Sequence, residues 1–74
     1  MEIKSNLGDF TYNSKDVVRI LNPKQRDLYL MNGIMPKDIY ASVDKETDEK
    51  ILVYIFARKD TREAYNKWLN YELK

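Results

Sequence analysis

The densest group of carboxylates in the sequence lies in the polar stretch 44–49, at Asp44, Glu46, Asp48 and Glu49. Carboxylates at alternate positions are also found at the start of calcium-binding loops. Such a loop needs a glycine at its sharp turn and a distal bidentate glutamate, and neither stands at the required distance. A polar cluster between two apolar segments is typical of a solvated turn. We therefore expect no metal ion and no other cofactor to bind here.

Two residue types that carry much of enzyme chemistry are absent, because the sequence contains no histidine and no cysteine. The commonest general base and the commonest thiol nucleophile are therefore missing. The two glycines, Gly8 and Gly33, are far apart and form no phosphate-binding loop. An enzyme would need paired carboxylates or a desolvated lysine. We expect a non-enzymatic protein.

The charges are nearly balanced, with thirteen basic and twelve acidic side chains and a net charge of +1. This balance argues against a strongly basic nucleic-acid binder and against an acidic mimic of DNA. If segments 16–21 and 51–57 are neighbouring strands, however, Arg19 approaches Arg58. The positive patch that would bind nucleic acid, with tyrosines as stacking surfaces, comprises Arg19, Arg58, Lys59 and Arg62. Ordinary solubilising charges are the favoured interpretation, and nucleic-acid binding is the alternative function.

The segment 51–57, Ile-Leu-Val-Tyr-Ile-Phe-Ala, is an uncharged run rich in β-branched and aromatic residues. Its length and its charged flanks predict a strand that is buried on both faces. Strand alternation places Leu52, Tyr54 and Phe56 on one face, and the other face carries Ile51, Val53, Ile55 and Ala57. The rest of the chain must position these two faces.

The flanking segments predict strands and a first helix. Segment 16–21 is predicted as a strand, with a helix beginning at Ser14 as the alternative. Asn22 and Pro23 then begin a helix that runs to about residue 32, with Asn22 as the cap and Gln25 reaching back to it. Its buried stripe would comprise Leu28 and Met31, with part of Tyr29 or Leu30.

Segment 38–43 is predicted as a strand that pairs with 51–57 in an antiparallel hairpin, because a six-residue link is too short for a crossover. Residues 59–74 are predicted as a second helix with a capping box from Asp60 to Glu63 and an ion pair from Glu63 to Lys67. Trp68 would anchor this helix in the core.

These elements define an α+β fold, in which a small three-stranded, mostly antiparallel sheet carries two helices on one face in the order β-α-β-β-α. Residues 15–74 form a single domain, and residues 1–14 form an N-terminal arm. Within this arm, 10–12 would form a short edge strand, or the arm would lie over the exposed sheet.

A domain of 74 residues has a thin core, so one face of the sheet would stay uncovered. We expect that face to be a partner-binding surface made by Tyr40, Leu52, Tyr54 and Phe56. The arm itself, a second copy in a homodimer, or a target protein would cover it.

The stretch from about Val18 to Trp68 resembles a family of small uncharacterised proteins carried by phages and prophages of Gram-positive bacteria. The likeness rests on Ile20-x-Asn22-Pro23-Lys24-Gln25, Tyr29-Leu30-x-Asn32-Gly33, Asp38-Ile39-Tyr40, 51–56 and Thr61-Arg62-Glu63-x-Tyr65-x-x-Trp68. It implies a phage-type accessory protein inside a bacterial cell. Such proteins often bind and block a host protein, including defence machinery, as anti-CRISPR proteins do.

The N-terminus, Met-Glu-Ile-Lys-Ser, has no apolar signal segment, and no apolar run approaches the length of a membrane span. We therefore expect a cytoplasmic protein that does not bind a membrane.

Overall fold

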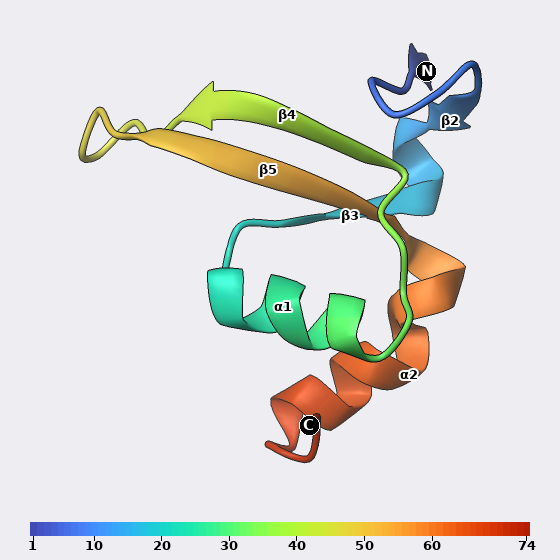
Figure 1. Ribbon diagram of the computed structural model, residues 1–74, viewed down its shortest axis with the longest axis vertical. Coiled ribbons are helices and arrows are strands. Elements are labelled where there is room, and N and C mark those ends of the chain that lie inside the picture. Colours follow the sequence, from blue (N-terminus) through green and yellow to red (C-terminus); the bar gives the residue numbers. More distant parts are fainter.

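Strand β5 (Lys50–Ala57) is the central strand of a three-stranded antiparallel sheet in the computed structural model, which describes residues 1–74 (Figure 1). It lies between β3 (Val17–Ile20) and β4 (Asp38–Val43). Helix α1 (Pro23–Met31) connects β3 to β4, and α2 (Arg58–Leu69) follows β5 directly. The predicted small α+β fold with two helices is confirmed.

The two helices cover one face of the sheet (Figure 1). The core on this side consists of Ile20, Tyr29, Phe56 and Ala64. The Tyr29 ring meets the Phe56 ring edge-on, with centroids 5.3 Å apart and planes at 81°. Edge-to-face pairs of this kind stabilise a core by more than the burial of their apolar area alone. Phe56 is therefore a central residue of the helix-side core.

The N-terminal arm covers the opposite face near its base. Its strands β1 (Glu2–Lys4) and β2 (Thr11–Asn13) form an antiparallel hairpin, and a short 3-10 turn (Ser14–Asp16) leads into β3. Buried Tyr12 packs with Val53 and Ile55, and Ile3 packs against the same cluster. The arm therefore lies over the sheet, which is one of its two predicted conformations.

Helix α1 begins as predicted, since the Asn22 side chain accepts hydrogen bonds from the amides of Lys24 and Gln25 at 2.9 and 3.2 Å. The expected role of Gln25 is wrong, because its amide nitrogen donates to the Tyr29 hydroxyl at 3.0 Å in the core. The predicted stripe is wrong at Met31, which is 78% exposed. Gln25 and Tyr29 make the buried side instead, because the helix packs on the sheet through that edge.

Helix α2 begins one residue earlier than predicted and lacks the expected capping box. Ala57 is its N-cap and makes no side-chain cap hydrogen bond, since β5 runs straight into the helix. The hydroxyl of buried Thr61 instead donates to the carbonyl of Ala57 at 3.3 Å. The predicted ion pair forms between Lys67 and Glu63 at 3.6 Å. Trp68 is only partly buried, and Ala64 is the core residue of this helix.

We predict that Phe56→Ala lowers the free energy of unfolding by about 3–5 kcal/mol, because it empties the centre of the helix-side core. The matched change Leu52→Ala, on the same strand but 51% exposed, should cost less than about 1 kcal/mol. Urea unfolding followed by circular dichroism measures both. Equal losses for the two variants would contradict this assignment of the core.

Candidate partner-binding surface

The outer half of the β4–β5 hairpin extends beyond the helices and the arm (Figure 1). Three apolar residues of this half, Ala41, Val43 and Leu52, are exposed, with Val43 at 52% and Leu52 at 51%. The register pairs Ala41 with Leu52, so directly opposed side chains share a face. The hairpin therefore presents a small apolar surface, made by Ala41, Val43 and Leu52, which we call the hairpin patch.

The four residues predicted to bind a partner do not form one exposed surface. Phe56 is fully buried under the helices, so it cannot contact another molecule in this fold. Tyr40 pairs with Val53 and packs with the arm-side cluster, so it lies on the opposite face from Tyr54. The expectation of a single exposed face is wrong because the helices cover one face of the inner half of β5 and the arm covers the other.

Tyr54 and Leu52 keep part of the predicted exposure. Tyr54 is half-buried and stacks on Phe56, with ring centroids 6.4 Å apart. The Arg26 guanidinium lies 5.0 Å from the centre of the Tyr54 ring, in cation–π geometry. Leu52 has no comparable cover. Of the predicted set, Leu52 is therefore the residue most accessible to a partner.

Sequence reasoning missed Ala41 and Val43, although a usable signal was present. The link 44–49 places Val43 opposite Lys50, so strand alternation places Ala41 opposite Leu52. Counting pairs from the turn would have put Ala41 and Val43 beside Leu52, and Tyr40 on the other face.

A buried carboxylate at the start of β4 holds the arm in place. Asp38 is 2% exposed, and its Oδ2 accepts a hydrogen bond from the Tyr12 hydroxyl at 2.6 Å. Its Oδ1 accepts from the backbone amides of Asn6 and Ile39, both at 2.9 Å. The Ser5 hydroxyl also donates to the carbonyl of Lys37. These bonds tie the arm to the base of the hairpin and leave its outer half uncovered.

The titration of this buried cluster follows from its hydrogen bonds. Burial by itself would raise the pKa of Asp38, but the hydrogen bonds from Tyr12, Asn6 and Ile39 outweigh it and hold the pKa below its ordinary value. Burial, reinforced by the hydrogen bond to the Asp38 carboxylate, raises the pKa of Tyr12 to about 12. The folded state therefore favours a charged Asp38 beside a neutral Tyr12.

The carboxylates of the hairpin turn lie in local turn contacts. Asp44 accepts a hydrogen bond from the backbone amide of Glu46 at 2.9 Å, and Asp48 adopts a left-handed backbone conformation with φ of 58°. No group of three or more acidic side chains converges as a ligand set anywhere in the chain.

The structure brings three of the four predicted basic residues to one groove. Arg19, Arg58 and Arg62 line a groove of about 490 Å³ between β3 and the two helices, together with Tyr29 and Tyr65. No acidic side chain lines this groove. The fourth residue, Lys59, lines the neighbouring groove, which Arg58, Arg62, Glu2 and Asp16 also line.

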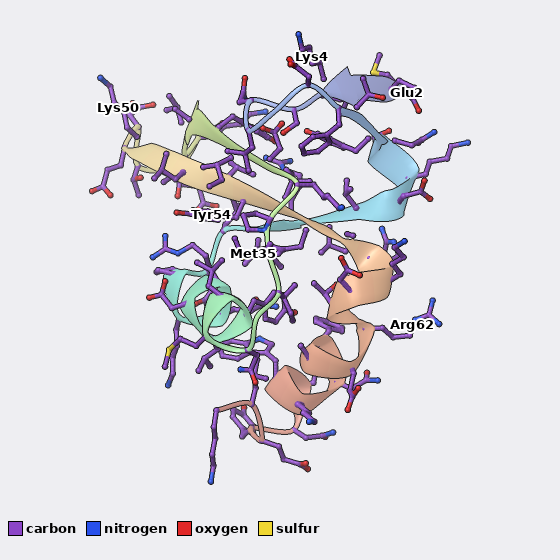
Figure 2. The ribbon with its side chains drawn as sticks, turned by 45° about the vertical axis from the view of Figure 1, so that its right-hand side comes forward. Glu2, Lys4, Met35, Lys50, Tyr54 and Arg62 are labelled. Carbon is purple, nitrogen blue, oxygen red and sulfur yellow. The ribbon has the colours of Figure 1, made fainter.

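None of these four basic residues forms an ion pair, because the two ion pairs of the chain are Arg26–Asp27 and Lys67–Glu63. Arg58 donates to the carbonyl of Val17 at 3.2 Å, which holds the start of α2 against β3. Arg62 points away from α2 into solvent (Figure 2). The groove therefore offers positive charge to a ligand, and Arg58 in addition stabilises the contact between α2 and β3.

No family model matches the chain, and neither a curated protein nor a solved structure matches it. Neither helix has the length and apolar character that a membrane span requires.

We predict that acid destabilises the protein through Asp38. Because the folded-state pKa is lowered, the stability that Asp38 contributes is present above its ordinary value of 3.8 and is lost as the pH falls through the lowered value. Between pH 5 and 2 the free energy of unfolding of the wild type should therefore fall more steeply than that of Asp38→Asn. Urea titrations at each pH measure this difference, and parallel curves would contradict it.

We predict the opposite pH dependence for Tyr12. Its folded-state pKa is raised from 10.0 to about 12, so its contribution is present below pH 10 and is lost as the pH rises from 10 through 12. Tyr12→Phe should remove this alkaline loss. It should also increase hydrogen exchange in residues 1–13, because the hydroxyl no longer holds Asp38. Unchanged exchange in the arm would contradict the assigned role.

Proposed function

We propose that this chain is a non-enzymatic protein-binding module whose docking element is the outer half of the β4–β5 hairpin. The main observation that supports this proposal is the exposure of Val43 and Leu52 on a part of the hairpin that neither the helices nor the arm cover. An exposed, clustered apolar surface on a small domain favours a binding role.

The shape and the rigidity of the hairpin support a docking role. Its two strands project a two-stranded ribbon whose acidic turn keeps the tip in water, while the hairpin patch offers apolar contact area. The body supplies rigidity through β5, whose inner residues Val53 and Phe56 are fully buried. A rigid, preorganised apolar element loses little entropy when it binds.

The biological setting that we propose is the cytoplasm of a bacterial host cell. The likeness to phage and prophage proteins over Val18–Trp68 supports an accessory protein that occludes a surface of a host protein, including a defence protein in the manner of an anti-CRISPR. This setting rests on the resemblance, whereas the docking element rests on the geometry.

We predict that Leu52→Glu weakens partner capture while Leu69→Glu leaves it intact. The two leucines are matched controls, since they are 51% and 55% exposed and lie on different surfaces. A buried charge in the patch should weaken binding by more than about 1 kcal/mol, or about fivefold. Affinity capture from a bacterial lysate with quantitative mass spectrometry measures it. A partner that binds both variants equally would remove the hairpin patch from the site.

Nucleic-acid binding is the second candidate function, favoured by a groove that Arg19, Arg58 and Arg62 line and that no acidic side chain lines. The half-exposed Tyr65 at its rim would stack on a base of a single strand. With Lys59 beside them, four cations would contact the phosphates of the strand.

This second candidate predicts affinity for a single-stranded oligonucleotide that falls with salt. If all four cations neutralise phosphates, the slope of log K against log salt should be roughly −3. The double variant Arg19→Gln with Arg62→Gln should halve that slope. The control Lys45→Gln with Lys74→Gln, which removes the same charge elsewhere, should leave it unchanged. Fluorescence anisotropy provides the measurement, and an absent or salt-independent signal would exclude this function.

A further inference from the structure

The outer edge of β4 carries backbone groups that the chain leaves unpaired. The amide of Asp44 donates to the carbonyl of Glu49, so alternation turns the backbone groups of Tyr40 and Ser42 toward β5. The amides and carbonyls of Ala41 and Val43 therefore point outward. No other segment of the chain bonds them.

The inner part of the same edge is already occupied. The Ile39 carbonyl accepts from the Asn6 side chain at 3.3 Å, and the Ile39 amide donates to Asp38. The free part of the edge is thus limited to four backbone groups, two on Ala41 and two on Val43.

This edge also lacks the features that usually prevent an edge strand from pairing with the edge of another molecule. Native edges carry charged residues or proline, or they are covered. Residues 39–43, Ile-Tyr-Ala-Ser-Val, contain neither charge nor proline. The opposite edge of the sheet differs, because β3 exposes Arg19 and its Val17 carbonyl accepts from Arg58. Of the two edges, β4 is the one suited to pairing.

We propose that the β4 edge pairs with β4 of a second copy of this chain, antiparallel, with Ser42 opposite Ser42. In this register Ala41 of each copy faces Val43 of the other, and the four free groups of each copy form four hydrogen bonds in total. Centring the pairing on Ala41 instead would require the groups of Ile39, which are engaged. The inference rests on the proposed docking role of the hairpin and names a second copy as the molecule at its edge.

The continuous sheet formed by the two copies brings side chains into contact and also pairs the backbone groups. Because directly opposed residues share a face, the Ala41–Val43 contacts form beside Leu52 and extend the hairpin patch across both copies. Antiparallel pairing also brings the turn 44–49 close to the base of the other copy, and this turn carries four acids and one lysine. At that base, Lys4 lines a groove together with Tyr40. Complementary charge of this kind sets orientation.

The absence of cysteine from the chain permits a register-specific test with Ser42→Cys. Residues that oppose each other in a non-hydrogen-bonded pair have Cα atoms about 4.5 Å apart, within the range that a disulfide spans. The matched variants Ala41→Cys and Val43→Cys place their sulfurs on diagonal positions, where the Cα atoms are about 7–8 Å apart. We expect Ser42→Cys to form a covalent dimer at least tenfold faster than either control under mild oxidation.

Sedimentation of the wild type complements the cross-linking. We expect a mass of twice 8.9 kDa at high concentration, and we expect Val43→Pro to remain monomeric. Proline there removes an outward amide while the ladder to β5 keeps its bonds. Circular dichroism verifies that the variant is folded.

Equal cross-linking rates for the three cysteine variants, or a faster rate for Ala41→Cys, would overturn this register. A wild type that stays monomeric at high concentration would overturn the dimer. Partner capture that depends on Leu52 in such a monomer would leave the proposed function standing. A dimer whose Leu52→Glu variant captures the same proteins would instead support the inference and contradict the hairpin patch as a heterologous docking site.

Discussion

The buried carboxylate of Asp38 constrains where each part of this molecule lies. It accepts hydrogen bonds from the Tyr12 hydroxyl and from two backbone amides, so a charge that would be costly to bury is offset by three donors. Because Tyr12 and Asn6 belong to the arm, these same bonds place the arm over Val53 and Ile55. The arm thereby covers the face of β5 that the helices leave open.

The helices and the arm both end near the middle of β5, and for this reason the outer half of the hairpin is exposed. The helices cover Phe56, and the arm covers Val53, but Leu52 lies beyond either. No other element of residues 1–74 lies over the outer hairpin. The proposed docking role therefore arises from the geometry of coverage rather than from a specialised motif, and the free β4 edge has the same origin.

Local signals in the sequence predicted much of the fold but less of the site. The apolar run 51–57 predicted a central strand, and Asn22 with Pro23 predicted the start of α1, because strand burial and capping depend on neighbouring residues. The capping box at Asp60 failed, because β5 continues straight into α2. The partner-binding set failed at Phe56 and Tyr40, because membership of a face depends on the register across the hairpin and on what covers it.

The sequence by itself determined the α+β pattern, the antiparallel hairpin and the central position of β5, because periodicity, turn length and caps are local properties. Only the tertiary structure decided which face each cover occupies. It brought Asp38 to Tyr12 across twenty-six residues, and it gathered Arg19, Arg58 and Arg62 at one groove. Such long-range contacts depend on the packing of all elements together, so no local pattern encodes them.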